Sequence, residues 1–317
     1  MTFLLRRACF ALWLALALTA IGGLQPAMAA EPKRLALVVG NSAYSSISAL
    51  VNPTNDATDI AAKLKAMQFE VLLGVDATHA KMTELLHQFK GKLTRNHIAL
   101  IFYAGHGVTV NNESFLLPVD MPAVLDLDAE GKLTADALNR HLVSMAAMLA
   151  PLEDAKIGIV FLDACRTNLA TPGLGLTLRT ASLAQSRTAR IMRGTGTLDV
   201  KPSPYSAGVF RAYSTQLDNV ASDGAGRNSP FTKALLTHMA TKGLSIQELM
   251  IRVRKSVIAE TKAAQVPWEE AALNEVFYFV PAAGSPSLAP LGKRPAAGGQ
   301  PGNNLPPNLG VGVGTGL

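Results

Sequence analysis

Short apolar runs alternate with amphipathic segments along most of this chain. The runs are nearly continuous in hydrophobic residues, which is typical of strands that a sheet buries on both faces. They predict strands at residues 35–39, 70–73, 98–103, 156–162, 209–214 and 276–280, with a short hairpin around 115–117.

Between these runs, apolar residues recur every three or four positions, which indicates helices with one buried face. The helices are expected near residues 53–67, 82–93, 230–239 and 245–257. Asn52 followed by Pro53 is typical of a helix start, with Asn52 as the capping residue. Ser245 and Glu248 have the spacing of a capping box.

Strands that alternate with helices of this length predict an α/β fold, in which a mostly parallel sheet is covered by helices on both faces. Ligand sites in such sheets lie beyond the carboxyl ends of the strands. His106 follows the apolar run at 98–103, and Cys165 follows the run at 156–162. Both side chains are therefore expected at the same end of the sheet.

Three segments stand outside this pattern. Residues 1–29 combine Arg6 and Arg7 with a short apolar stretch and a small-residue cleavage site, as in a secretory signal. They predict export to the periplasm, with no stable membrane span after the signal is removed; an uncleaved N-terminal anchor is the alternative. Residues 167–206 are expected to form a long flexible loop, and residues 282–317 a disordered tail rich in proline and glycine.

Charge and composition narrow the range of partners. The net charge of +6 falls to +4 without the two arginines of the signal, and no run of Lys or Arg occurs, which argues against nucleic-acid binding. The glycine at Gly40 is not followed by a phosphate-loop lysine, which argues against nucleotide binding. No cofactor or metal is expected; a calcium role for the acidic stretch at 120–136 is the alternative, although it lacks an EF-hand pattern.

Cys165 is the single thiol left after removal of the signal, because the other cysteine is Cys9. A thiol becomes a strong nucleophile once it is ionised, and a nearby imidazole can take its proton and later protonate the leaving amine. The N–H groups of Gly107 and Cys165 are the candidate oxyanion hole. The alternative is an inert buried cysteine beside a structural loop histidine, His106.

Seven segments together resemble the caspase-like cysteine peptidases and look most like their secreted bacterial branch. In chain order they are LALVVGNSAY (35–44), NPTNDA (52–57), FYAGHG (102–107), FLLPVD (115–120), FLDACRTN (161–168), ASDGAGRNSPF (221–231) and QVPW (265–268). The resemblance covers residues 33–281 and implies a three-layer sandwich around a six-stranded, mostly parallel sheet. It also implies an endopeptidase that acts through a thioester, with His106 as the base and Cys165 as the nucleophile.

Asp163 stands two residues before Cys165, where caspases carry glutamine. This acidic position is similar to that of metacaspases, whose specificity pocket accepts Arg or Lys, and Asp56 matches the other acidic position of that pocket. Two carboxylates in a cleft favour a cationic side chain, and Ser214 is a further candidate for the pocket lining. The alternative role of both aspartates is local, as helix caps or partners of a helix dipole.

Three questions stay open on the sequence alone. The arginines at 179, 187, 190 and 193 suit self-cleavage of the long loop, and a solvated loop suits them equally well. The same fold can serve an inactive scaffold or binding module, or a cysteine hydrolase with another acyl substrate. The oligomeric state is also open, because the last strand can be a free edge.

Overall fold

The structure is a computed structural model that describes residues 31–110, 113–122, 124–127, 135–164, 167–168, 177–180, 208–216 and 222–285. The predicted signal segment, the predicted tail beyond residue 285 and Cys165 itself lie outside these ranges. Within these ranges, no helix is both long enough and apolar enough to cross a bilayer.

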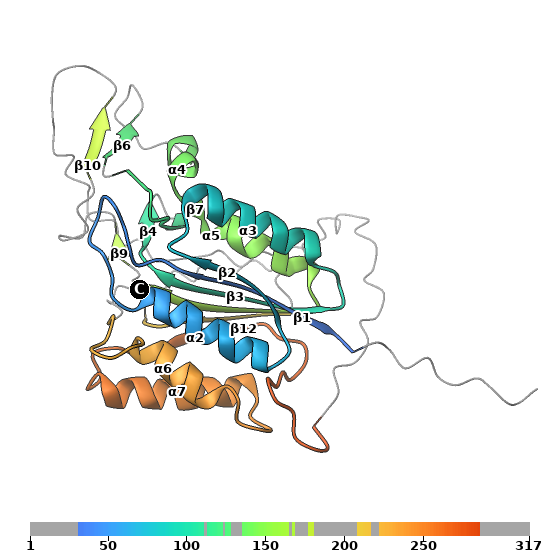
Figure 1. Ribbon diagram of the computed structural model, residues 1–317. Helices are drawn as coiled ribbons and strands as arrows, with labels where there is room; N and C mark the ends of the chain where they lie inside the picture. The colour runs from blue at the N-terminus through green and yellow to red at the C-terminus, as the bar shows by residue number, and fades with distance from the viewer. Residues whose placement is uncertain are drawn as a thin grey trace, which may run out of the picture.

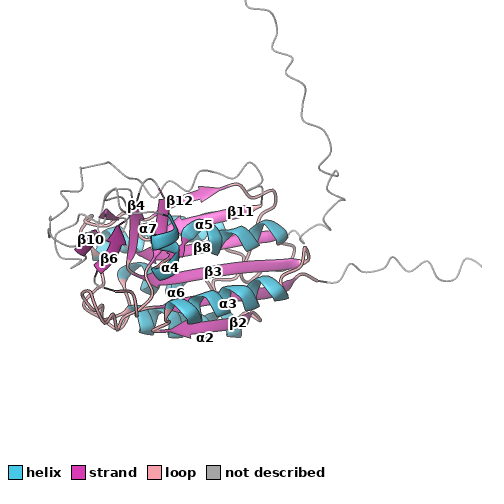
Figure 2. Cartoon of the chain, turned by 90° about the horizontal axis from the view of Figure 1, so that it is seen from above, coloured by secondary structure: helices cyan, strands magenta, loops and turns pink. Residues whose placement is uncertain are grey.

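A six-stranded sheet forms the centre of the molecule (Figure 2). From one edge to the other its strands are β12 (Trp268–Ala271), β11 (Val209–Tyr213), β8 (Ile157–Ala164), β3 (His97–Gly105), β1 (Lys33–Gly40) and β2 (Glu70–Val75). Neighbouring strands are parallel except at the edge, where β12 runs antiparallel to β11. This confirms the predicted α/β class and the mostly parallel sheet.

Helices cover both faces of this sheet, as Figure 1 shows. One face carries α2 (Pro53–Ala66), α6 (Pro230–His238) and α7 (Ile246–Glu260); the other carries α3 (His79–Lys92), α5 (Met145–Leu149) and the 3₁₀ helix η1 (Ala150–Asp154). The strands β3 and β8 are buried along their whole length. Their continuous hydrophobicity in the sequence follows from this double burial.

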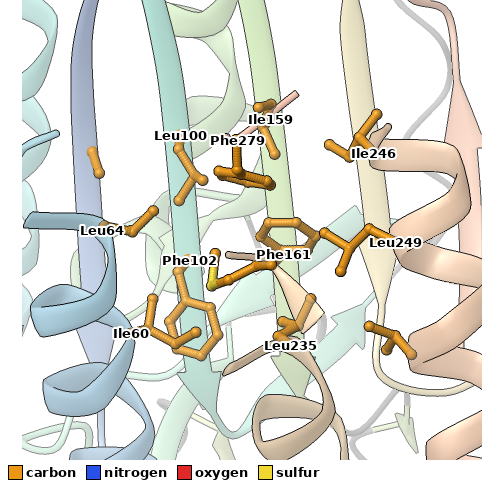
Figure 3. Close-up of a cluster of buried hydrophobic side chains, with 14 of the residues drawn as sticks. Ile60, Leu64, Leu100, Phe102, Ile159, Phe161, Leu235, Ile246, Leu249 and Phe279 are labelled. Atoms are coloured by element: carbon orange, nitrogen blue, oxygen red, sulfur yellow. The ribbon is translucent and has the colours of Figure 1, made fainter. Parts of the chain in front are cut away.

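Successive side chains of a strand point to opposite faces of the sheet, so each central strand supplies two cores. In β3, Leu100 and Phe102 belong to the cluster under α2, α6 and α7, whereas Ile101 and Tyr103 belong to the cluster under α3 and α5. Figure 3 shows the first cluster, in which side chains from the sheet meet those of all three helices.

A smaller set of elements lies at the carboxyl end of the main sheet. It comprises a second sheet in the order β7 (Val143–Ser144), β5 (Glu113–Leu116), β4 (Gly107–Val110) and β9 (Thr167–Asn168), the pair β6 (Val124–Leu127) and β10 (Thr177–Thr180), and helix α4 (Ala135–His141). The antiparallel pair β4–β5 confirms the predicted hairpin. This second sheet is built around the segment that follows His106.

One predicted strand and one predicted loop need correction. Residues 276–280 do not form the last strand: Phe277 and Phe279 pack into the core, and only Tyr278 bridges to Ser245. The sixth strand is instead β12, a short edge strand with a polar sequence. The expected long loop at 167–206 contains the short strands β9 and β10, while its other residues lie outside the described ranges.

The helix starts give one confirmation and one correction. The capping box of α7 is present, because Ser245 and Glu248 satisfy each other's backbone N–H groups. Asn52 stands at the N-cap position of α2, but its side chain makes no capping bond. It donates instead to the backbone carbonyl of Asp223. The start of α2 is therefore linked to a loop 171 residues away in the sequence.

Candidate active site

The carboxyl ends of β3 and β8 bring the two predicted catalytic segments together. Gly105 is paired with Ala164 in the main sheet, and Val108 is paired with Thr167 in the second sheet. Between these two pairs lie His106 and Gly107 on one segment and Cys165 and Arg166 on the other. The two segments are therefore paired immediately before and immediately after these residues. Cys165 itself lies outside the described residues.

His106 is held through its ring and its backbone. The Nε2 atom lies 2.8 Å from the carbonyl oxygen of Ser48, and this contact requires Nε2 to carry a proton. Nδ1 is then the nitrogen with the free lone pair when the imidazole is neutral. Burial lowers the pKa of His106 below its ordinary value, although Ser48 and the charge of Asp223 oppose this shift. The side chain is therefore a neutral base at neutral pH.

Gly107, the predicted oxyanion donor, begins β4 directly after the histidine. The N–H of Leu117 donates to the carbonyl of His106, so His106 and Leu117 are a hydrogen-bonded pair that extends the β4–β5 ladder. Gly107 and Leu116 are the next pair, which is non-hydrogen-bonded in an antiparallel ladder. The N–H of Gly107 is thus directed away from β5 and toward the edge along which β9 runs.

Asp56 and Asp163, the predicted pocket acids, face the same helix start from two sides. Asp163 lies at the end of β8 and accepts hydrogen bonds from the hydroxyls of Ser229 and Thr232. Asp56, in the first turn of α2, accepts a bond of 3.1 Å from the N–H of Ser229. Asp56 is 1% exposed and Asp163 is 7% exposed. The fold therefore brings these carboxyl groups together at the N-terminus of α6.

Burial raises the pKa of both acids. The pKa of Asp56 rises to about 8, first because it is buried and second because of the nearby charge of Asp163. The pKa of Asp163 is also raised, mainly by burial, although its hydroxyl donors oppose the shift. Two like charges at one buried site cannot both be ionised without a cation. The pair therefore retains a proton at neutral pH in the absence of a cationic partner.

Ser214, the third predicted pocket residue, directly follows β11 and is fully buried. Its side chain lies beside Asp163 and helps to favour the charged form of that acid, but it makes no hydrogen bond of standard geometry with any described residue. Ser214 is thus placed with the two acids, and its role in a pocket stays a prediction.

The sequence did not single out two groups that the structure adds to this region. One is the carbonyl of Ser48, which carries no side-chain signature. The other is Asp223, whose carboxylate accepts from the N–H groups of Val51 (2.6 Å) and Asn52 (3.2 Å). Asp223 lies within the ASDGAGRNSPF segment, but nothing in that segment indicates its partners. Asp223 connects the loop that holds His106 to the loop that leads to Ser229.

The described ranges contain no group of three or more His, Cys, Asp or Glu side chains that could hold a metal ion. The acidic stretch at 120–136 falls partly outside those ranges. The three acids Asp56, Asp163 and Asp223 interact electrostatically, yet each is already engaged by hydrogen-bond donors.

Comparisons with known proteins bear on the fold and the family of this chain. The mouse and human proteins described as mucosa-associated lymphoid tissue lymphoma translocation protein 1 (a homolog in the mouse) are each 32% identical to this chain over 89 residues. The match covers 28% of this chain and 11% of theirs. The crystal structure of caspase-1 from Spodoptera frugiperda superposes with a TM-score of 0.54, covering 80% of this chain and 92% of that one at 15% identity, and shows the same fold.

A family model described as the caspase domain matches residues 33–278, which is more than three quarters of the chain. This span contains both sheets, the loop of His106 and the two buried acids. The chain therefore belongs to the caspase-like cysteine peptidase superfamily.

Proposed function

We propose that the protein is a cysteine endopeptidase that cleaves after Arg or Lys, with Cys165 as its nucleophile and His106 as its base. The observation that carries this proposal is the strand pairing on both sides of the two residues. Neighbouring strands are about 4.8 Å apart. A cysteine one residue beyond Ala164 therefore starts within reach of a histidine one residue beyond Gly105.

The geometry of His106 suits the chemistry of such a dyad. The neutral imidazole has its Nε2–H bonded to Ser48, so the lone pair of Nδ1 is available for the thiol proton of Cys165. The thiolate adds to the substrate carbonyl, and the imidazolium then protonates the amine as the C–N bond breaks. A water molecule hydrolyses the remaining thioester, again with His106 as the base.

The N–H of Gly107 supports the step in which negative charge develops on the carbonyl oxygen. Its direction away from β5 makes it available to a group beside β9, because no ladder bond to β5 uses it. The N–H of Cys165 is the second proposed donor. Two such donors stabilise the oxyanion without any rearrangement during the reaction.

The acid pair Asp56 and Asp163 supports specificity for a basic side chain. A guanidinium or ammonium group that enters this site would replace the retained proton and allow both carboxylates to ionise. Arg would gain most, because its planar donors can pair with carboxylates in a bidentate manner. The substrate partner we propose is thus a protein or peptide with Arg or Lys before the scissile bond.

One observation favours the alternative of an inactive scaffold. The carboxyl groups of Asp56 and Asp163 are almost fully buried and already accept bonds from Ser229 and Thr232. In that alternative they stabilise the start of α6, and no substrate reaches them. The difference between the two functions is therefore whether this site opens to a cation.

The test compares three fluorogenic peptides that differ only in Arg, Lys or Asp before the scissile bond. We expect turnover of the Arg and Lys peptides, no turnover of the Asp peptide, and none by Cys165→Ala. A thiol-reactive probe followed by mass spectrometry should label Cys165. Turnover of no peptide together with no labelling of Cys165 would favour the scaffold, and turnover of the Asp peptide alone would contradict the role of the acid pair.

The proposed export and self-cleavage can be checked on the same preparations. N-terminal sequencing of protein from a periplasmic fraction should begin after residue 29 if the secretory signal is removed there. Self-cleavage in the loop at 167–206 predicts that the intact mass of wild type differs from that of Cys165→Ala by more than the substitution itself. Equal masses after that correction would rule it out.

A further inference from the structure

Both backbone polar groups of His106 are bonded to buried tyrosines. The N–H of His106 donates to the hydroxyl of Tyr44 at 2.8 Å. The carbonyl of His106 accepts the hydroxyl proton of Tyr103 at 2.7 Å, in addition to the N–H of Leu117. The peptide groups of a residue at the end of a strand commonly face water or backbone partners. Here a side-chain hydroxyl takes that place at the N–H, and a second hydroxyl joins the backbone partner of the carbonyl.

The supply of protons fixes the direction of these bonds. Each phenol has one proton to donate. Tyr103 directs its proton to the carbonyls of His106 and Leu117, so its oxygen can only accept from Tyr44. The contact of 3.5 Å between the two hydroxyl oxygens therefore runs from Tyr44 to Tyr103, and it is the weakest bond of the set.

Three bonds then close into a ring: His106 N–H to Tyr44, Tyr44 O–H to Tyr103, and Tyr103 O–H back to the carbonyl of His106. We propose that Tyr44 and Tyr103 are positioning residues, which hold His106 through this closed ring of hydrogen bonds. This inference rests on the proposed role of His106 as the base. It assigns to the two tyrosines a function that neither the family match nor the dyad requires.

Burial of both tyrosines and a glycine beside them preserve the closed ring of hydrogen bonds. Tyr103 is fully buried and Tyr44 is 7% exposed, so water has little access to either hydroxyl. Burial raises the pKa of both phenols, and both therefore keep their protons throughout the working pH range. Gly105 makes the approach possible, because a Cβ atom there would lie 2.6 Å and 2.8 Å from the two hydroxyl oxygens. Its φ of +150° also favours glycine.

The closed ring of hydrogen bonds acts on the imidazole of His106 in two ways. It fixes the backbone of His106, and it places the side chain of Tyr44 against the imidazole. The aromatic ring of Tyr44 lies against the imidazole, with 4.7 Å between the ring centroids. The backbone is fixed by the two hydroxyls, and the far side of the imidazole is fixed by the carbonyl of Ser48. These restraints together select the tautomer with the proton on Nε2 and the orientation that leaves Nδ1 open.

The test uses Tyr44→Phe, Tyr103→Phe and the double variant, with Tyr278→Phe as a matched control. Tyr278 is a partly buried tyrosine that bridges to Ser245 and lies beside Lys33 and Glu70, at the amino end of the sheet. Each Phe keeps the aromatic ring and removes one hydroxyl, so the fold should survive; circular dichroism checks this. We expect kcat for the Arg peptide to fall about 10- to 100-fold in each single variant, with KM within about threefold.

The double variant should be no worse than the more damaged single variant, because one broken bond already opens a closed ring. Additive losses, or a loss confined to KM, would overturn the proposal. An equal loss in Tyr278→Phe would show a general effect of the substitution and would also overturn it.

A second measurement remains decisive if the wild type cleaves no peptide. Nitrogen NMR of the histidine side chains, with His106 assigned from its loss in His106→Gln, reports the tautomer directly. Wild type should show Nε2–H, and the Tyr44→Phe and Tyr103→Phe variants should show a mixture. Unchanged NMR signals would overturn the ring in an active or an inactive protein, whereas failure of the peptidase proposal alone would leave the mixture in place.

Discussion

The candidate active site has a histidine half, around His106, and an acidic half, around Asp56 and Asp163, and burial shifts the pKa values of the two halves in opposite directions. Burial lowers the pKa of His106 and raises the pKa of Asp56 and Asp163, so every one of these groups tends toward its neutral form. The histidine half is complete within the protein, because Ser48, Tyr44 and Tyr103 satisfy its ring nitrogen and its backbone. The acidic half holds two carboxyl groups, neither of which forms an ion pair with a Lys or Arg of the described residues.

This difference separates a preorganised group from a group that awaits a ligand. A base must have its proton acceptor ready before substrate arrives, and hydrogen bonds from rigid elements achieve this. A specificity pocket gains affinity when the ligand supplies what the protein lacks, here a positive charge. Each of the following predictions changes one half and asks whether the other half remains unchanged.

The largest effect is expected from Asp163→Asn, which removes one of the two acids but leaves the base unchanged. We expect kcat/KM for the Arg peptide to fall about 1,000-fold, because a buried charge partner of the substrate is lost. Alkylation of Cys165 by iodoacetamide should stay within about threefold of wild type. The matched control is Asp154→Asn, since Asp154 is exposed near the amino end of the same strand. A parallel loss of alkylation would mean that the halves are not separate.

The next effect concerns binding of a small cation. Below pH 8 the acid pair holds a proton that benzamidine must displace, because the pKa of Asp56 is about 8. The dissociation constant should therefore fall as pH rises from 6 to 8, by up to about tenfold per pH unit. Calorimetry on Cys165→Ala also measures the protons that are released. Binding that does not change with pH would place the cation elsewhere.

A stability measurement decides between a pocket and a helix cap. The folded pKa of Asp56, about 8, lies above the unfolded value of about 3.9. Between about pH 4 and pH 8 the folded state therefore binds more protons than the unfolded state, and the stability of wild type is lost as pH rises through that range. Asp56→Asn should match wild type near pH 5 and exceed its free energy of unfolding by about 1–3 kcal/mol at pH 8. Guanidinium unfolding at both pH values provides the measurement.

The opposite result would be equally informative. If Asp56→Asn is less stable than wild type at pH 8, the carboxylate stabilises α6 through Ser229 in its charged form. The acid pair would then be a structural cap, and the scaffold alternative would gain support. Asp154→Asn again serves as the control, with no expected dependence of its effect on pH.

The smallest effect is expected for Asp223→Asn. The charge of Asp223 raises the pKa of His106 against the effect of burial. Its removal should lower that pKa by less than about one unit, since asparagine retains an oxygen that can accept one backbone bond. An NMR titration of His106 measures the shift, and the activity at pH 8 should change little. A rise of this pKa would contradict the electrostatic link between the halves.

The sequence predicted the regular elements well because their signals are local. Alternating apolar runs located β3 and β8, and helical spacing located α2 and α7, since each signal needs fewer than twenty residues. The same signals placed His106 at the carboxyl end of the sheet. They failed at 276–280, where Phe277 and Phe279 enter the core without forming a strand. Hydrophobicity reports burial, and burial does not require a strand.

The parts of the site that escaped prediction depend on contacts between distant segments. Asn52 resembles a capping residue in the sequence, yet its side chain bonds to Asp223. The carbonyl of Ser48 has no residue-specific signature, and the Tyr44–Tyr103 contact joins residues 59 positions apart. The position of Cys165 lies outside the described residues, so the dyad stays a prediction that the proposed experiments test.

The bond between Asp223 and the loop at 51–52 has a consequence for how this protein can change over generations. One carboxylate ties the segment that leads to the acids to the segment that supports the histidine. A change in the length or path of one loop would therefore shift the other, whereas a substitution of an acid side chain that leaves both loops in place would not. Insertions and deletions in the two loops should arise together in descendants of this chain, while single substitutions at the acids can arise alone.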